Sequence, residues 1–207
     1  MRNRINKIKK AVLFITGLLF SFMGFSQEKE AINWMPFEKA VELAQKNHKH
    51  IIVDIYTQWC GPCKMMSKNT FQHPAIAKYV NEHYYAVKFD AENFDTLKFT
   101  LNIPDTMRDK KTGKVIRVGT KKQPLVFYNA SPKGTPRAVH QFAASILDNN
   151  LSYPSLVFLN DKIQRIDIVK GYHTAPQFEP IIKYIGSSGY AKAKYDDWLK
   201  TFKAEIK

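Results

Sequence analysis

The heptapeptide Gln58-Trp59-Cys60-Gly61-Pro62-Cys63-Lys64 holds the only two cysteines of a 207-residue chain, separated by two residues. A disulfide between residues this close in sequence closes almost no loop, so it would hardly restrain the unfolded chain. Zinc is another use of this spacing, but it normally needs a second tight pair of Cys or His ligands. Only His48 and His50 form such a pair, and they precede a predicted strand. The spacing therefore favours a redox-active dithiol and no metal site.

The first 26 residues have the three parts of a secretory signal peptide. Residues 1–10 carry five Arg or Lys and no acid, residues 11–25 are nearly all apolar, and Gly24 and Ser26 suit a signal peptidase. A retained membrane anchor is the alternative, but the apolar run is shorter than the roughly 20 residues that a spanning helix needs. We expect cleavage after Ser26 and export to an oxidising compartment. Residues 27–207 are then long enough for one domain.

The positive charge of the mature chain is concentrated in one segment. The formal charge of the whole chain is +14, of which residues 1–10 supply +5. Residues 96–137 hold ten Lys or Arg against two Asp, a net +8. Such a segment can meet an acidic partner, an anionic lipid or a polysaccharide, or it can be an ordinary solvated loop. Nucleic acid is not expected as a partner, because the chain has no nucleic-acid motif and is predicted to be exported.

Apolar periodicity predicts an α/β fold. Residues 50–56 and 155–159 are apolar, β-branched runs typical of strands buried on both faces. Further strands are predicted over residues 84–89 and 163–169, the second returning antiparallel after a turn. Helices are predicted after the dithiol and over residues 37–47, 75–82, 138–147 and 176–185. Parallel strands joined through helices, followed by an antiparallel edge, give a mixed central sheet flanked by helices.

Two segments extend beyond such a core. Residues 96–137 are predicted to form a hairpin-like insertion, with short strands at 114–118 and 125–128 and turns at 109–113 and 131–136. Residues 188–207 are predicted as a C-terminal helical extension, because apolar side chains recur there at helical spacing. Packing on the domain explains that apolar stripe better than membrane binding does. Its members are Tyr195, Trp198, Leu199, Phe202 and Ile206.

A position at the start of a helix would make Cys60 reactive. Its sulfur would face unpaired backbone N–H groups and the positive end of the helix dipole. These favour the thiolate, which is the nucleophile in thiol–disulfide exchange. Cys63, one turn further and expected to be more buried, would attack the mixed disulfide on Cys60 and release the product. Gly61 permits a tight turn, Pro62 costs no hydrogen bond in the first helical turn, and Trp59 would shield one side of the sulfur.

Asp54 interrupts the apolar strand that precedes the dithiol. A carboxylate at the centre of a buried strand is costly unless it is paired or neutral, and burial raises its pKa. Asp54 is therefore a candidate base for the proton that Cys63 loses, directly or through water. A purely structural buried carboxylate is the alternative. Lys88, in the neighbouring strand, is a candidate partner for Asp54 or an ordinary strand-end lysine.

The Tyr153-Pro154 pair precedes an apolar strand and is a candidate cis peptide bond. A proline there has no N–H, and a tight turn beside the dithiol would leave neighbouring backbone free to pair with a substrate peptide. Gln123-Pro124 looks similar, but only Pro154 is followed by strand, turn, strand, Gly171 and helix. His140, at the start of the helix predicted over 138–147, could approach the site, but a capping or surface role is favoured.

Several of these strings together resemble the thioredoxin family. They are Val53-Asp54, Trp59-Cys60-Gly61-Pro62-Cys63-Lys64, Lys88-Phe89-Asp90, Tyr153-Pro154-Ser155 and Gly171. Residues 69–74, Asn-Thr-Phe-Gln-His-Pro, are similar to the C-terminal domain of DsbD-type thiol:disulfide interchange proteins. The resemblance covers residues 34–95 and 138–186, and the additions resemble those of secreted thioredoxin-like proteins of Gram-negative bacteria.

The resemblance implies a thioredoxin fold and a role for each matched residue. Cys60 would be the attacking thiol, Cys63 the resolving thiol, Asp54 the buried base and Pro154 the cis-proline of the substrate groove. The basic insertion at 96–137 and the extension at 188–207 depart from the family pattern. No cofactor is expected beyond the redox-active disulfide Cys60–Cys63.

We therefore expect an exported thiol–disulfide oxidoreductase in the periplasm or cell envelope of a Gram-negative bacterium. The Gly61-Pro62 pair matches thioredoxin, whose reduction potential is about −270 mV against about −120 mV for DsbA, so reduction of protein disulfides is favoured. Expected partners are disulfide-containing exported proteins and a DsbD-like membrane electron donor. The alternatives are a disulfide oxidant or isomerase, and a non-catalytic binding module on a thioredoxin scaffold.

Overall fold

The structure is a computed structural model that describes residues 31–207. The predicted signal peptide, residues 1–26, lies outside the described residues. Within residues 31–207, no helix is long and apolar enough to cross a membrane.

Four strands form a mixed sheet at the centre of the described chain: β1 His50–Tyr56, β2 Tyr84–Asp90, β5 Ser155–Leu159 and β6 Arg165–Lys170. Their order in the sheet is β2-β1-β5-β6. β1 pairs parallel with β2, and β5 runs antiparallel to both β1 and β6. The inner strands β1 and β5 are the two apolar runs of the sequence, because both of their faces are covered. The predicted mixed sheet is confirmed.

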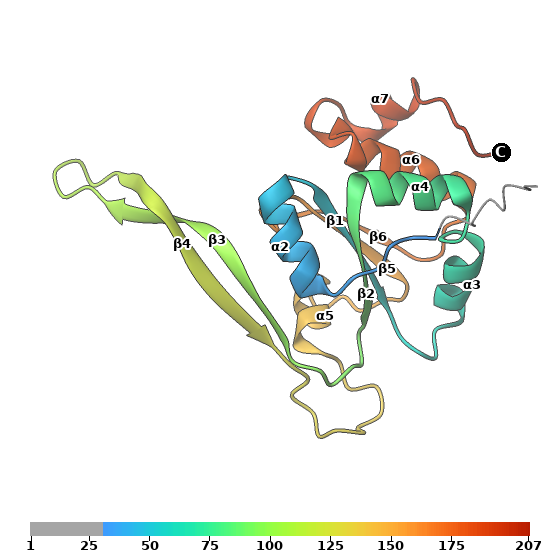
Figure 1. The fold of residues 1–207 in the computed structure, drawn as a ribbon, viewed down its shortest axis with the longest axis horizontal. Coiled ribbons are helices and arrows are strands. Elements are labelled where there is room, and N and C mark those ends of the chain that lie inside the picture. Colours follow the sequence, from blue (N-terminus) through green and yellow to red (C-terminus); the bar gives the residue numbers. More distant parts are fainter. Residues whose placement is uncertain (1–30) are drawn as a thin grey trace, which may run out of the picture.

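Helices cover both faces of this sheet (Figure 1). They are α2 Phe37–Asn47, α3 Gly61–Asn69, α4 Pro74–His83, α5 Gln141–Ile146 and α6 Ala175–Gly186. Alternate side chains of β1 enter two apolar cores, because successive residues of a strand point to opposite faces. Ile51, Val53 and Ile55 pack with α2 and α5, whereas Ile52 packs with α3, α4 and α6. Residues 57–60 join β1 to α3 and so place the dithiol at the carboxyl end of an inner strand.

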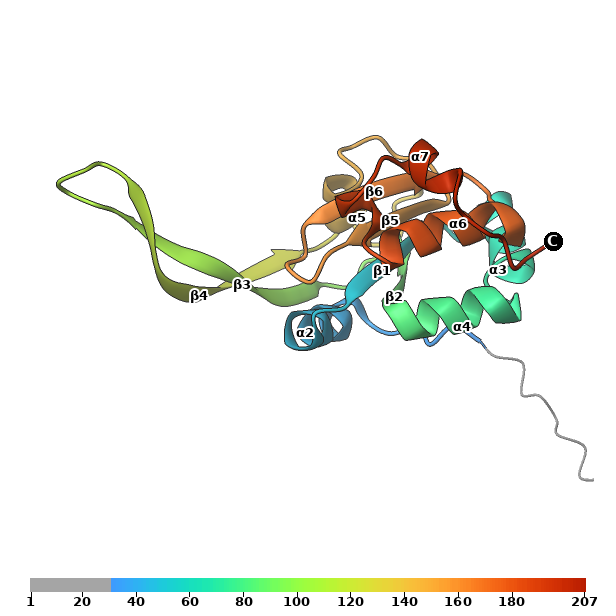
Figure 2. The same cartoon turned by 90° about the horizontal axis from the view of Figure 1, so that it is seen from above.

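Residues 97–127 form a long two-stranded hairpin that extends away from the sheet and helices (Figures 1 and 2). Its strands, β3 Leu97–Arg108 and β4 Val115–Phe127, pair antiparallel with a register shift between Asp105 and Thr106. The predicted hairpin is confirmed, but the short strands predicted at 114–118 and 125–128 are parts of one continuous strand. β3 is not among the strands predicted above, although residues 97–103 alternate apolar and polar side chains in the way typical of a strand. Pro104 and Pro124 obscure both strands, yet each is tolerated because both strands have a free edge.

The root of the hairpin packs on α2 and α5. The ring of Phe99 stacks on that of Phe127 with centroids 5.9 Å apart, and Phe142 of α5 lies 5.7 Å from Phe127. Gln45 of α2 accepts a hydrogen bond from the N–H of Asn102 at 2.7 Å. These contacts attach the first residues of β3 and the last residues of β4 to the domain.

Two predicted helices differ in the structure. The helix predicted over residues 138–147 spans only Gln141–Ile146, because His140 is extended and caps α5. The predicted C-terminal helix is replaced by a 3-10 turn, Gly189–Ala191, and a short α7, Tyr195–Leu199. Leu199 is exposed and Ile206 is buried, so the predicted apolar stripe does not form one helical face.

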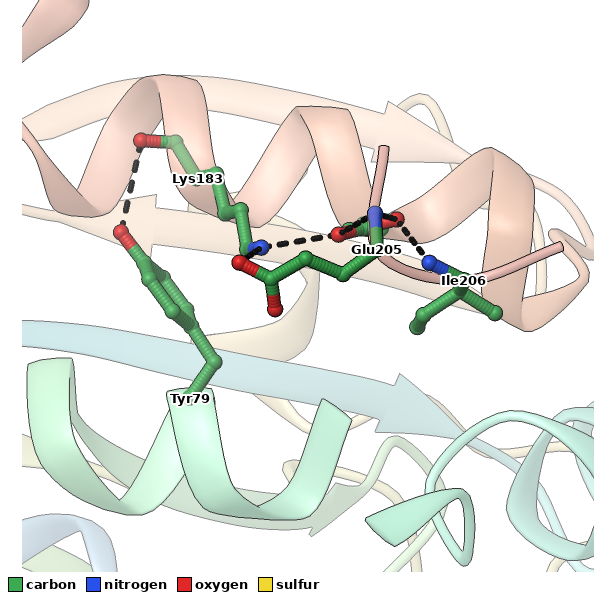
Figure 3. A network of polar contacts seen from close by, with 5 residues as sticks. Tyr79, Lys183, Glu205 and Ile206 are labelled. Atoms are coloured by element: carbon green, nitrogen blue, oxygen red, sulfur yellow. Dashed lines mark hydrogen bonds and ion pairs between the residues drawn. The ribbon is translucent and has the colours of Figure 1, made fainter. Parts of the chain in front are cut away.

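A buried carboxylate holds the last residues of the chain instead (Figure 3). Glu179 of α6 accepts hydrogen bonds from the backbone N–H groups of Glu205 and Ile206, at 2.9 and 3.0 Å. Lys183 bridges the carboxylates of Glu179 and Glu205, at 2.8 and 2.9 Å. The two N–H groups are therefore not available for the i→i−4 bonds of a helix. This explains why the predicted helix does not continue to Ile206.

Candidate active site

Cys60 and Cys63 lie at the N-terminal end of α3 and are joined by a disulfide. Cys60 is the N-cap residue, and its Sγ accepts a hydrogen bond from the N–H of Cys63 at 3.1 Å. Pro62 occupies the first turn, where its missing N–H costs no hydrogen bond. A negative charge on Cys60 Sγ would be stabilised by this N–H and by the helix dipole. These are the surroundings that a nucleophilic thiolate needs.

The two cysteines do not differ in depth as predicted. Cys60 is 3 % exposed and Cys63 is 6 % exposed, so Cys63 is not the more buried residue. The N–H of Cys60 donates to the carbonyl of Thr57 at 3.2 Å. The disulfide joins the two sulfur atoms, so the two side chains lie at nearly the same depth.

Trp59 projects from the surface beside the dithiol, with more than half of its side chain exposed. Its Nε1 donates to Glu92 Oε1 at 3.0 Å, and the Arg137 guanidinium lies 5.1 Å from the ring centroid. Tyr153 meets Trp59 edge to face, with centroids 6.1 Å apart. The sequence pattern points to Trp59 and Tyr153 but not to Glu92 and Arg137. No local signal marks these two residues, because they reach Trp59 from segments far away in the chain.

Asp54 is buried at the centre of β1, and its Oδ1 has no hydrogen-bond partner among the described residues. Burial raises the pKa of Asp54 from 3.8 to about 7, and the charge of Lys88 opposes this with a smaller lowering. A pocket of about 250 Å³ is lined by Asp54, Cys63 and Lys88, among others. A polar space of this size can hold water. A water in this pocket would connect Cys63 with Asp54.

Lys88 lies beside Asp54 in the β1–β2 pairing, but the structure records no ion pair between these two described residues. Its ammonium group instead donates to Ser67 Oγ at 3.1 Å and lies over the rings of Tyr56 and Trp34. The direct pairing considered for Lys88 is therefore not formed. Lys88 acts on Asp54 through its charge, across the pocket that both residues line.

The Tyr153–Pro154 peptide bond is cis. The carbonyl of Pro154 accepts a hydrogen bond from the N–H of Gly171 at 2.8 Å. Gly171 has a φ of 86°, in the region that favours glycine. Because Tyr153 contacts Trp59, this turn lies beside the segment that carries the dithiol. The structure thus brings together residues from three distant segments, and their role in binding a substrate stays a prediction.

His140 takes the capping role rather than a place at the dithiol. Its Nδ1 accepts a hydrogen bond from the N–H of Phe142 at 3.1 Å, so its Nε2 donates to the carbonyl of Asp95 at 2.9 Å. Burial lowers the pKa of His140, although the bond to Asp95 raises it. His140 is therefore a neutral structural histidine that joins α5 to the segment before β3.

A mixed sheet of this strand order, with a dithiol opening the helix after an inner strand, defines the thioredoxin fold and the class of thiol–disulfide oxidoreductases. The chemistry resides in Cys60 and Cys63, which exchange two electrons as dithiol and disulfide. Within residues 31–207, no group of three or more His, Cys, Asp or Glu side chains is placed to hold a metal ion. The chain belongs to the family described as "Thioredox_DsbH: Protein of unknown function, DUF255", whose model matches residues 22–164.

Individual proteins are similar to this chain over part of its length. Thioredoxin C-3 of Corynebacterium nephridii is 30% identical over an alignment of 97 residues that covers 41% of this chain and 62% of that protein. A thioredoxin from Thermus thermophilus has a TM-score of 0.50 at 15% identity, covering 78% of this chain and 92% of that one. A thioredoxin-fold protein from Helicobacter pylori has a TM-score of 0.44 at 17% identity, covering 73% and 77%. The chain spans less than two thirds of the length of its curated relatives, from 8% of an uncharacterized Caenorhabditis elegans protein to 62% of Thioredoxin C-3.

Proposed function

We propose that this protein is an exported protein-disulfide reductase, which passes electrons from the Cys60–Cys63 dithiol to disulfides of other exported proteins. The observation that carries the proposal is the position of Cys60 at the N-terminus of α3, with Cys63 linked to Asp54 by a pocket. The Gly61-Pro62 pair supports reduction over oxidation, because thioredoxin has the same pair and a potential of about −270 mV.

The reaction would proceed by two thiol–disulfide exchanges. The Cys60 thiolate attacks one sulfur of the substrate disulfide, forms a mixed disulfide and expels the other substrate sulfur as a thiolate. Asp54, with a pKa of about 7, accepts the proton of Cys63 through the pocket. The Cys63 thiolate then attacks Cys60 Sγ and expels the second substrate thiolate. The substrate disulfide gains two electrons, and the protein is left with the Cys60–Cys63 disulfide.

Reduction of insulin with dithiothreitol as electron source tests this activity. We expect the wild type to accelerate precipitation of the insulin B chain and Cys60→Ser to be inactive. Cys63→Ser should attack insulin but not release it, so a mixed disulfide through Cys60 should accumulate and be visible by mass spectrometry. Equal rates for the wild type and both variants would refute a redox role for the dithiol.

A reductase in an oxidising compartment needs a source of electrons. We propose a membrane donor of the DsbD type, which would reduce the Cys60–Cys63 disulfide after each turnover. Alkylation of free thiols in intact cells reports the redox state of the pair. The pair should be largely reduced in normal cells and oxidised in cells that lack the donor. An unchanged redox state would exclude this donor.

The pattern of residues 1–26 supports export to the periplasm or cell envelope of a Gram-negative bacterium. Cell fractionation followed by intact-mass measurement tests the prediction. A mature chain that begins at Gln27 in the periplasmic fraction is expected, whereas an uncleaved chain in the cytoplasm would contradict it.

A further inference from the structure

The tip of the β3–β4 hairpin, residues 106–118, carries unneutralised positive charge. Its one carboxylate, Asp109, is used inside the turn, where it accepts hydrogen bonds from the N–H groups of Lys111 and Thr112. The ion pair recorded within the hairpin, Lys121–Asp105, lies below the tip. Within the described residues, no ion pair is recorded for the five cations of the tip, which are Arg108, Lys110, Lys111, Lys114 and Arg117.

The tip is also far from the carboxylates of the domain. The hydrogen bond between Asn102 and Gln45 attaches β3 to α2. From Asn102 to Arg108 the strand advances about 20 Å, at roughly 3.3 Å per residue, and both views show the ribbon running away from the domain (Figures 1 and 2). This distance exceeds the Debye length of about 8 Å at physiological ionic strength. The carboxylates of the domain therefore do not neutralise the cations of the tip.

Exposed apolar side chains lie among these cations. Met107, Val115 and Val118 are 54%, 63% and 51% exposed. Val118 stands at the register shift, where it has no partner on β3. Single exposed apolar residues are ordinary, but here three of them share the free end of a ribbon with five cations. Charge attraction together with shallow burial of apolar side chains is the combination that binds a protein segment to an anionic bilayer.

Two other partners fit the tip less well. Protein interfaces are enriched in aromatic residues and depleted in lysine, whereas residues 103–122 contain no aromatic residue and three of the five tip cations are lysines. A second copy of this chain is disfavoured, because two tips of the same charge repel each other. We propose that the hairpin tip binds the anionic headgroups of a lipid bilayer, with Met107, Val115 and Val118 entering the interface.

The direction of the hairpin determines how a membrane-bound domain would present its dithiol. In both views the tip and α3 lie at opposite ends of the molecule (Figures 1 and 2). A domain held to a bilayer by the tip therefore keeps α3, and the dithiol at its start, on the side away from the lipid. The proposal does not depend on the redox direction of Cys60–Cys63, because it rests on the hairpin alone.

Flotation of the full chain with vesicles tests the charge contribution. Vesicles of phosphatidylcholine alone are compared with vesicles that also contain phosphatidylglycerol. Each lysine near an anionic surface contributes a factor of about 5 to partitioning, so loss of three should weaken binding on the order of 100-fold. The tip variant is Lys110→Gln, Lys111→Gln and Lys114→Gln. A matched control removes the same charge from the body of the domain, with Lys78→Gln, Lys162→Gln and Lys192→Gln, and should bind nearly as the wild type does. All chains share the same N-terminal segment, so differences between them report on the changed residues.

The apolar contribution is tested by a second matched pair. Val118→Ser should weaken binding several-fold, whereas Val126→Ser, at the hairpin root and similarly exposed, should have little effect. Amide hydrogen exchange of residues 106–118 should slow with the anionic vesicles only, which locates the contact directly. The tip variants should reduce insulin at the wild-type rate, because they leave the dithiol intact.

The following outcomes would overturn the proposal. Equal binding of the wild type to neutral and anionic vesicles would show that the tip cations do not bind anionic headgroups. An equal loss in the tip variant and the body control would show that only net charge matters. Binding to polyglutamate without binding to anionic vesicles would assign the tip to an acidic protein instead.

Discussion

Replacing Asp54 by asparagine removes a buried charge and should stabilise the protein at neutral and alkaline pH. The pKa of Asp54 is raised from 3.8 to about 7 by burial. Below about pH 4 the carboxyl is protonated in both the folded and the unfolded state, so its ionisation does not affect stability. Between pH 4 and 7 the folded state binds more protons than the unfolded state, so stability falls as pH rises. Above pH 7 the loss is complete, at about 4 kcal/mol for a pKa difference of this size.

Urea unfolding of oxidised wild type and Asp54→Asn at pH 4 and pH 8 measures this effect. The asparagine amide is neutral at both pH values, so the stability difference between variant and wild type should be larger at pH 8 by about 4 kcal/mol. Asp167→Asn, at an exposed aspartate on β6, is the matched control for removing one carboxylate from the surface. The same Asp54→Asn variant should slow release of substrate from the mixed disulfide, on the order of 100-fold, because the proton acceptor is lost. A stability difference that is the same at both pH values would refute the assignment of a buried, weakly acidic carboxyl.

Two further changes test other contacts. Glu179→Gln should destabilise the fold by about 2 kcal/mol, because the charged acceptor for two backbone N–H groups is lost. Amide hydrogen exchange at Glu205 and Ile206 should become faster in this variant. Unchanged exchange at these two residues would contradict the hydrogen bonds to Glu179. Burial opposes a lower pKa of Glu179, but hydrogen bonds from Lys183 and the backbone lower that pKa overall. The stabilisation of the folded state by the charged Glu179 should therefore be present near neutral pH and be lost as the pH falls through the pKa of Glu179. His140→Ala should lower the free energy of unfolding in urea by about 1–2 kcal/mol, because α5 loses its cap. His140→Asn should lower it less, because asparagine also caps helices. Equal losses in the two variants would show that capping does not cause the loss of stability.

The sheet could be predicted from local sequence because its inner strands are buried on both faces. Residues 50–56 and 155–159 are short apolar runs bounded by turns, and such runs are typical of strands that are buried on both faces. The dithiol was predictable for a similar reason. Cysteine spacing, Gly61 and Pro62 are local signals that need no knowledge of distant segments.

The hairpin and the C-terminal tail depend on distant contacts, and local pattern predicted them less well. The first half of β3, residues 97–103, carries a local strand signal in its alternating apolar and polar side chains. Pro104 and Asp105 disfavour a strand, and pairing with β4 carries β3 beyond them. The C-terminal stripe has helical spacing, yet Glu179 of α6 binds the backbone at Ile206 and holds it out of a helix. In both cases tertiary pairing overrides local propensity.

The candidate site shows the same division. The motif predicts Cys60 at a helix start, and the charged residue in an apolar strand predicts a buried Asp54. The contacts of Trp59 with Glu92 and Arg137 join segments 33 residues or more apart, so neither partner had a local signal. The contact of Lys88 with Ser67 was missed for the same reason, because α3 supplies Ser67 to the pocket.

The reduction potential of the Cys60–Cys63 pair tests the proposed function most directly. The full chain is equilibrated with mixtures of reduced and oxidised dithiothreitol and glutathione, free thiols are alkylated, and the reduced fraction is read by mass spectrometry. A protein-disulfide reductase should give a potential near that of thioredoxin, about −270 mV. A value near that of DsbA, about −120 mV, would contradict the account, because the dithiol would then oxidise its substrates.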